Sequence, residues 1–203
     1  MKQRQIVIVK VLVWIAALAP LAYLVYGALT NNLGADPVAE IEHTTGRWVI
    51  RLLLATLAIT PLRRISGWNW LVRFRRLLGL FAFFYVCVHF LAYLWFDQNF
   101  AWASIVHDIP KRPFILVGFT ALVLLIPLAV TSTAGWIRRL GGKRWNALHK
   151  LIYAAAALCI VHFWWSQKAD HSRPLTYGII LAALLLTRVY FSLAKLRTRT
   201  AAA

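Results

Sequence analysis

The stretch LGLFAFFYVCVHFLAYLWF, residues 78–96, sets the fold class, because it is apolar almost throughout and yet contains His89. A second stretch, LIYAAAALCIVHFWW, residues 151–165, repeats the arrangement around His162. A run of about 20 apolar residues can cross the hydrocarbon core of a bilayer as a helix. Ionisable residues at that depth usually mark a functional site, and imidazole is a common axial ligand of haem iron. The two stretches therefore predict a membrane protein whose histidines hold a redox metal.

Composition agrees with a membrane location along the whole chain. Of the 203 residues, 61% are hydrophobic and 14% are charged, whereas about a quarter of the residues of a soluble domain are charged. The helices expected to cross the membrane lie near 6–28, 47–62, 77–96, 113–133, 147–166 and 174–193. The second is the shortest. Because no polar stretch is long enough for a separate soluble domain, we expect residues 1–203 to form a single all-α bundle of six transmembrane helices.

The formal net charge of +17 is distributed unevenly along the chain. Lysines and arginines gather before the first expected helix and after the second, fourth and sixth, so these groups share one side of the membrane. The six acidic residues fall in the other three connections: Asp36, Glu40, Glu42, Asp97, Asp108 and Asp170. Cytoplasmic loops are enriched in Lys and Arg, so both termini are expected in the cytoplasm of a cell with an inner membrane. The orientation of the chain in the membrane and its contacts with lipid headgroups thus account for the positive net charge, and no nucleic-acid partner is expected.

The third and fifth expected helices are separated by one helix and therefore run parallel. His89 and His162 should then lie at equal depth near the outer ends of their helices. Ala82 and Ala155 each stand seven residues earlier, nearly on the same helix face, and leave room for a macrocycle. These positions predict one b-type haem between the third and fifth helices, with His89 and His162 as its axial ligands. The alternatives are polar contacts between helices or a proton relay.

His149 lies thirteen residues before His162, which corresponds to roughly 20 Å along a helix. That separation suits a second haem near the inner surface. On an ideal helix, however, His149 lies well off the face of His162, and the matching positions of the third helix are Arg75 and Arg76. Either arginine could bind a haem propionate through its guanidinium group. The alternative is that His149 caps a helix start at headgroup level.

Two further arginines lie within expected helices. Arg51 stands about one turn into the second helix from the outside, where it could bind a propionate of the outer haem or a quinone headgroup, or else extend to the surface. Arg188 stands near the inner end of the last helix and is expected to reach the surface. His43 and the adjacent segment 44–47 lead directly into the second helix and could bind an anionic or quinone group.

Several segments together resemble a known family. They are LGADPVAEIEHTTGRW (33–48), LATLAITPL (54–62), RRLLGLFAFFYVCVHFLAYL (75–94), KRPFILVGF (111–119), LAVTSTAGWIRRLGGKRW (128–145) and LHKLIYAAAALCIVHFWW (148–165). In order and spacing they resemble MsrQ, formerly YedZ, the haem-binding membrane subunit of bacterial periplasmic methionine-sulfoxide reductase systems. That family is similar to the membrane domain of ferric reductases and NADPH oxidases.

The resemblance implies six inner-membrane helices and b-type haem, with the family's haem histidines falling on His89, His149 and His162. It also implies that electrons come from the quinone pool or a cytoplasmic flavin reductase and leave to a periplasmic molybdopterin methionine-sulfoxide reductase of the MsrP type. Members are associated with FMN as well. This chain has no glycine-rich phosphate loop, so we expect any FMN to bind at a site without a sequence signature, such as the inner arginines.

Three function classes compete at this point. The first is a non-catalytic electron-transfer subunit of an oxidoreductase system. The second is a self-contained transmembrane ferric or quinone reductase. The third, an ion-coupled transporter, would predict carboxylates within the helices or helices broken at the midplane, and no Asp or Glu falls within an expected span.

Overall fold

The computed structural model describes the backbone of residues 2–200 and the side chains of residues 2–194, and this part of the chain is helical apart from its connections. The α-helices are α1 (Gln3–Leu29), α2 (Pro37–Ser66), α3 (Val72–Ala92), α4 (Trp102–Lys111), α5 (Pro113–Val130), α6 (Ala134–Leu148), α7 (Leu151–Ser166) and α8 (Ser172–Thr200). A short 3₁₀ helix, η1 (Asn69–Leu71), precedes α3, and a π-helical turn, η2 (Tyr93–Asp97), follows it. The all-α class predicted from the sequence is confirmed.

Within the described residues, four helical stretches are long and apolar enough to cross a membrane. They are Gln3–Leu29, Asn69–Asp97, Pro113–Val130 and Ser172–Ala194. The pair α6 and α7, bent by 42° at its break, forms a fifth if it is one span. The expected helix at 47–62 lies inside α2, which is not among these stretches. The chain is thus a multi-pass membrane protein, and the count of six crossings stays a prediction.

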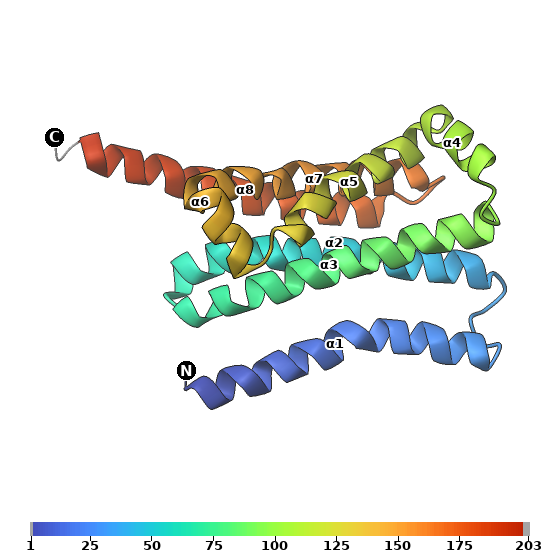
Figure 1. The fold of residues 1–203 in the computed structure, drawn as a ribbon, viewed down its shortest axis with the longest axis horizontal. Coiled ribbons are helices and arrows are strands. Elements are labelled where there is room, and N and C mark those ends of the chain that lie inside the picture. The colour runs from blue at the N-terminus through green and yellow to red at the C-terminus, as the bar shows by residue number, and fades with distance from the viewer. Residues whose placement is uncertain (1, 201–203) are drawn as a thin grey trace.

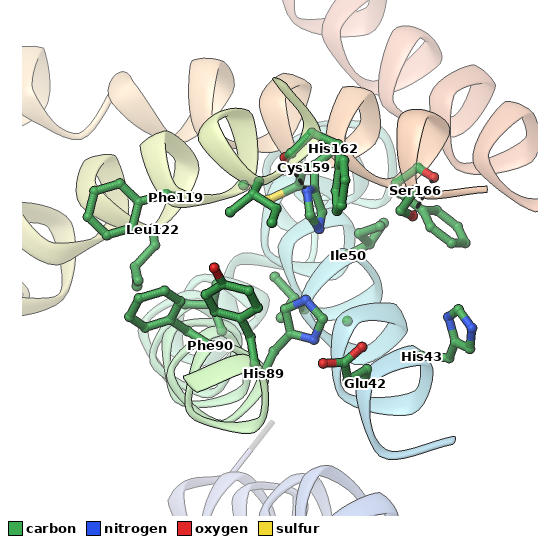
Figure 2. A pocket seen from close by; sticks show the side chains of 18 of the residues that line it. Glu42, His43, Ile50, His89, Phe90, Phe119, Leu122, Cys159, His162 and Ser166 are labelled. Carbon is green, nitrogen blue, oxygen red and sulfur yellow. Dashed lines mark hydrogen bonds between the residues drawn. The ribbon is translucent and has the colours of Figure 1, made fainter. Parts of the chain in front are cut away.

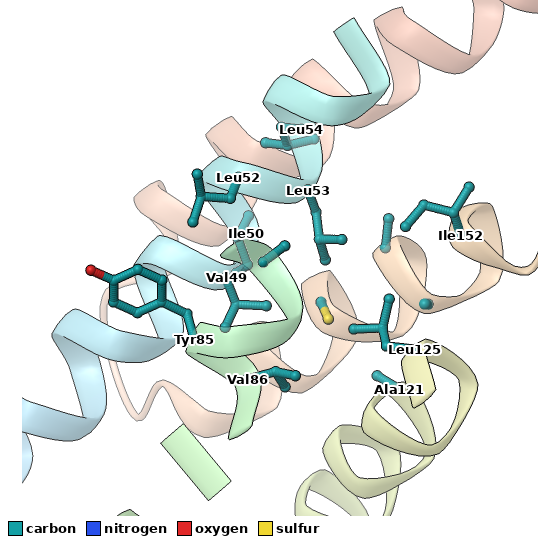
Figure 3. Close-up of a cluster of buried hydrophobic side chains, with 14 of the residues drawn as sticks. Val49, Ile50, Leu52, Leu53, Leu54, Tyr85, Val86, Ala121, Leu125 and Ile152 are labelled. Carbon is teal, nitrogen blue, oxygen red and sulfur yellow. The ribbon is translucent and has the colours of Figure 1, made fainter. Parts of the chain in front are cut away.

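The helices form a bundle in which α2 packs most closely against α3, and α5 against α7 (Figure 1). Leu53 and Leu57 of α2 are almost completely buried at its centre, where they join one continuous apolar cluster with α3, α5, α7 and α8 (Figure 3). By contrast, α1 and α8 expose many large apolar side chains, as lipid-facing helices do. The interior of the bundle is therefore formed around α2.

The boundaries of α2 differ from those predicted. The helix begins at Pro37 because the carboxylate of Asp36 accepts a hydrogen bond from the backbone N–H of Ala39 at 3.0 Å, and proline is favoured in a first helical turn. The expected span ends near residue 62, but the helix continues through Pro61 to Ser66 and ends at Gly67, whose φ of 74° is left-handed. The ten extra residues at the start carry part of α2 to the outer mouth of the site described below.

The connections separate into two groups at opposite ends of the bundle (Figure 1). The start of α1, the turn around η1, α6 and the far end of α8 lie at one end, which carries most of the Lys and Arg. The connection 30–36, α4 and the segment 167–171 lie at the other end. These are the two sets of connections that the charge pattern assigns to the cytoplasmic and outer sides.

Candidate functional site

His89 of α3 and His162 of α7 meet in the half of the bundle nearest α4. Figure 2 shows their rings pointing toward one another across a cavity of about 290 Å³. The ring centres are 6.1 Å apart and the ring planes are inclined by 77°. The sequence placed these histidines at equal depth on parallel helices, and the structure brings them together in that way.

One ring nitrogen of His162 is held by the backbone. Its Nδ1 lies 2.7 Å from the carbonyl oxygen of Phe114 in α5. A carbonyl oxygen can only accept, so Nδ1 carries the proton and donates it. The lone pair of neutral His162 is therefore on Nε2. A backbone carbonyl bonded to the second nitrogen is the usual way in which a metal-binding histidine is oriented.

His89 is oriented in the same sense by a side chain. Its Nδ1 lies 3.2 Å from Oγ1 of Thr45, and that hydroxyl also lies 2.7 Å from the carbonyl oxygen of Ile41 and 3.1 Å from that of Glu42. Thr45 has one hydroxyl proton, which goes to a carbonyl, so its oxygen accepts a proton from His89 Nδ1. Both histidines therefore direct an unprotonated Nε2 to the space between them.

Two glycines leave room for the imidazole rings. A Cβ atom at Gly118 of α5 would lie 2.7 Å from Nδ1 of His162 and 2.9 Å from its Cε1. A Cβ atom at Gly46 of α2 would lie 3.3 Å from Cε1 of His89. Glycine allows a backbone to approach another group this closely. Ala82 and Ala155 are fully buried in the apolar cluster and line no part of this cavity, so the room expected beneath the histidines stays a prediction.

The spacing of the rings suits a metal ion held between them. A bond from a metal to an imidazole nitrogen is about 2 Å long and the ring centre lies about 1 Å further on, so two imidazoles on opposite faces of one metal have centres about 6 Å apart. The observed 6.1 Å agrees with this separation. The donor set of two neutral imidazoles, each with its other nitrogen fixed, fits the axial positions of a six-coordinate haem iron.

The mouth of the cavity is polar and contains charges of both signs. Arg47 and Arg112 supply guanidinium groups, and Glu42 and Asp97 supply carboxylates. Glu42 lies before the part of α2 expected to cross the membrane. Burial, together with the negative charge of Asp97, raises the pKa of Glu42 from 4.5 to about 7. His43, which the sequence offered as a site for an anionic or quinone group, also lines the mouth.

Arg51, which the sequence offered as a propionate or quinone ligand, does not line this cavity. It lies on another face of α2, where its Nε donates a hydrogen bond to the hydroxyl of Tyr177 in α8 at 3.0 Å. The arginines that do line the histidine cavity are Arg47 and Arg112. Sequence reasoning gave neither of them a haem role, because Arg47 is the first residue of the expected second helix and Arg112 lies just before the expected fourth helix.

His149 lies at the opposite, basic end, in the break between α6 and α7. The sequence predicted a continuous helix from 147, but α7 begins at Leu151, so the ideal-helix angle between His149 and His162 does not apply. Its Nε2 is 3.0 Å from Oγ1 of Thr131 and its ring stacks on Trp145, with centres 3.9 Å apart. The charge of Arg75 lies close enough to act on this imidazole.

Arg75 and Arg76, both in α3, differ in exposure. Arg75 is half-buried and close to His149, whereas Arg76 is exposed. Arg188 was expected to extend to the surface but points inward, where it donates to the hydroxyl of Tyr153 at 2.7 Å and to the carbonyl oxygen of Leu57 at 2.6 Å. Its Nε is buried without a hydrogen-bond partner among the described residues. The inner half of the bundle thus holds a group of cations beside one histidine.

Comparison with known proteins gives consistent matches. Residues 45–160 match the family described as ferric reductase like transmembrane component. A protein of Herminiimonas arsenicoxydans is 54% identical over 190 residues, which cover 93% of this chain and 87% of that protein. One from Xanthomonas campestris pv. campestris (strain 8004) is 52% identical over 203 residues, with 97% and 93% covered, and one from Xanthomonas oryzae pv. oryzae is 51% identical over 200 residues, with 96% and 91% covered. Each is named "Protein-methionine-sulfoxide reductase heme-binding subunit MsrQ".

Proposed function

Because the chain belongs to the ferric reductase-like transmembrane family and, within it, to the MsrQ heme-binding subunits, we propose that it is the membrane electron-transfer subunit of a methionine-sulfoxide reductase system. It takes electrons from the quinone pool or a cytoplasmic flavin reductase. It delivers them through b-type haem to a periplasmic molybdopterin reductase of the MsrP type, which repairs oxidised proteins. In this role the chain conducts electrons between other redox partners across the bacterial inner membrane, with both termini cytoplasmic.

The observation that carries this proposal is the pair of imidazoles at 6.1 Å with both Nδ1 atoms engaged. Haem bound between them supplies one-electron chemistry at iron. His89 and His162 would hold it, and Thr45 and the Phe114 carbonyl fix the orientation of these two imidazoles. Hydrogen bonds from the second nitrogen raise the basicity of each ligand and so favour the oxidised metal. Gly46 and Gly118 give the rings the space they need.

Arg47 and Arg112 are the residues that would hold the propionates of this haem. Both line the cavity at its polar mouth, and a guanidinium group binds carboxylate through two parallel hydrogen bonds. Each already contacts an acid, Arg47 with Glu40 at 3.7 Å and Arg112 with Asp108 at 2.7 Å. Such contacts position the two guanidinium groups before a cofactor binds.

A second electron-transfer site is proposed at His149, with Arg75 and Arg76 as candidate partners for haem propionates. It lies at the basic end, on the side from which electrons would enter. In the structure Oγ1 of Thr131 lies 2.6 Å from the carbonyl oxygen of Pro127, so the hydroxyl proton is used there and Nε2 of His149 donates to this oxygen. The unprotonated nitrogen of His149 is then Nδ1, whereas the unprotonated nitrogen of His89 and of His162 is Nε2. FMN, if it binds, would use the same inner cations.

The outer end offers a face for the soluble partner. Asp170 is exposed there, whereas Asp108 is engaged with Arg112 and the hydroxyl of Tyr93. Exposed charge steers a partner to the surface and short-range contacts then fix its position. Asp170 is therefore a better candidate than Asp108 for guiding the reductase toward the histidine cavity, although both are acidic residues of the outer connections.

The experiment that tests the proposal uses membranes containing the chemically reduced protein. Purified periplasmic methionine-sulfoxide reductase and a sulfoxide substrate are added, and haem absorbance is followed. Reoxidation should require both additions. His89→Ala and His162→Ala should each remove the low-spin haem spectrum, and His107→Ala, which changes an exposed outer histidine, should keep it. If the haem stays reduced with both additions while quinone or ferric iron alone oxidises it, the chain is a self-contained reductase and the proposal is wrong.

A further inference from the structure

A second cavity, of about 430 Å³, lies between α2 and α8, toward the same end of the bundle as the histidine site. Its lining residues are Thr44, Arg47, Trp48, Arg51, Arg173, Thr176 and Tyr177. Three of these are arginines, two are threonines, and none is acidic. Within the described part of the chain, this cavity therefore combines cations, hydroxyl groups and aromatic rings in the way that binds an anion.

Arg51 is already oriented for a ligand. Its Nε donates to the hydroxyl of Tyr177 at 3.0 Å, and its guanidinium carbon lies 5.1 Å from the ring centre of Trp48. None of the hydrogen bonds among described residues uses its two terminal nitrogens. A planar guanidinium group held by its Nε and by an aromatic face has those two donors left for an anionic oxygen.

The charges around the cavity are incompletely balanced. Arg47 is paired with Glu40 at 3.7 Å, and Asp170, which is exposed, lies close enough to Arg173 for the two charges to interact. Neither Arg51 nor Arg173 forms an ion pair with a carboxylate of any described residue. An anion that entered the cavity would therefore meet two guanidinium groups without such a partner.

The position of the cavity points to lipid. Arg173 and Thr176 lie in the first turns of the apolar stretch Ser172–Ala194, and tryptophan and tyrosine are typical of the membrane interface. Ile180, one turn below Thr176 on the same face of α8, is 41% exposed and offers an apolar surface to an acyl chain. The cations thus stand at headgroup depth above a surface suited to hydrocarbon.

We propose that this cavity binds the phosphate of an anionic phospholipid, with Arg51 and Arg173 as its principal ligands. The lipid would lie between α2, which supplies Thr45 and Gly46 to the histidine site, and α8, and would tie the two helices together at their outer ends. This role is independent of which soluble protein receives the electrons.

The test uses the purified, haem-loaded chain in detergent and measures the midpoint of thermal unfolding as lipid is added. Binding to the folded state raises that midpoint with ligand concentration, so the series gives an apparent Kd. Phosphatidylglycerol should stabilise the protein more strongly than phosphatidylcholine. Arg51→Gln and Arg173→Gln should each weaken the apparent affinity for phosphatidylglycerol by about tenfold, the loss of one charge-assisted contact. Arg64→Gln, a control that changes an α2 arginine stacked on Phe191 at the other end, should not.

Other occupants give different results. If inorganic phosphate produces the full stabilisation and phosphatidylglycerol adds nothing, the site binds a soluble phosphate and the lipid assignment is wrong. If Arg51→Gln loses the low-spin haem spectrum, Arg51 serves a haem propionate. Arg51→Lys, which keeps the charge but not the planar donor pair, should fold and retain haem while showing an intermediate affinity. An unchanged response to phosphatidylglycerol in both Arg51→Gln and Arg173→Gln would overturn the proposal.

Discussion

Replacing Gly118 by alanine should lower haem affinity without unfolding the protein. The added Cβ would lie 2.7 Å from Nδ1 of His162, closer than Cβ atoms are found to other heavy atoms, so the imidazole must move. The ring is held from one side by the Phe114 carbonyl, one helical turn before Gly118, at 2.7 Å. A displacement large enough to accommodate the methyl group weakens that hydrogen bond and turns Nε2 away from its partner across the cavity.

The size of the effect follows from the loss of this orienting contact. Removing a hydrogen bond that orients a metal ligand typically lowers metal affinity 10- to 100-fold, which corresponds to about 1.4 to 2.8 kcal/mol. The helix itself should gain stability, because alanine is favoured over glycine in a helix interior by up to about 1 kcal/mol. We therefore expect Gly118→Ala to remain folded and to lose haem.

The measurement is haem bound per chain by pyridine haemochrome, together with the rate at which haem passes to a competing apoprotein. Gly79→Ala is the matched control, because a Cβ there would meet only Cγ2 of Thr56 at an ordinary 3.7 Å. It should keep wild-type haem content and spectrum. If Gly118→Ala keeps them too, with the same transfer rate as Gly79→Ala, His162 is not held in the way described and the assignment of its Nε2 fails.

Three further predictions concern other parts of the structure. Thr45→Val removes the acceptor for His89 Nδ1 and should raise the haem midpoint potential in a redox titration, whereas Thr45→Ser should leave it unchanged; equal potentials in all three proteins would show that the hydroxyl does not act on the ligand. His149→Ala should lower haem content while the outer low-spin signal remains, and a single haem per wild-type chain would leave His149 without this role. Alkaline phosphatase fused within 97–112 should be active, because that loop is expected outside, and strong activity from a fusion at Arg139 would reverse the orientation.

Local properties of the chain were enough to predict the fold class and the meeting of His89 with His162. Hydropathy over about 20 residues identifies membrane-crossing helices, and the stretches containing α1, α5 and α8 were found close to their observed bounds, whereas α3 begins at Val72, before the predicted start at 77. Because the third and fifth expected helices run parallel, the positions of His89 and His162 along their own helices give the depth of each in the membrane. The helix α2 was placed less well, since its charged first turns and interior Pro61 conceal a helix that neighbouring helices enclose.

The site beyond its two histidines depended on contacts between helices. Thr45 and Gly46 of α2 meet His89 of α3, while Gly118 of α5 meets His162 of α7. A glycine inside a helix signals close approach by another group, but the sequence does not state which group approaches. The break at His149 was likewise hidden, because the residues on both sides of it favour a helix.

The sequence by itself determined that this is an all-α membrane protein, which ends of its helices are basic, and that His89 and His162 lie at one depth. Those properties follow from composition and spacing along single helices. Only the tertiary structure decided which imidazole nitrogen faces the cavity, that Arg47 and Arg112 rather than Arg51 line it, and that Arg51 belongs to a separate cavity with Arg173. Each of these depends on the rotation of one helix against another, which is set by packing many side chains together and leaves no periodic signal in any one segment.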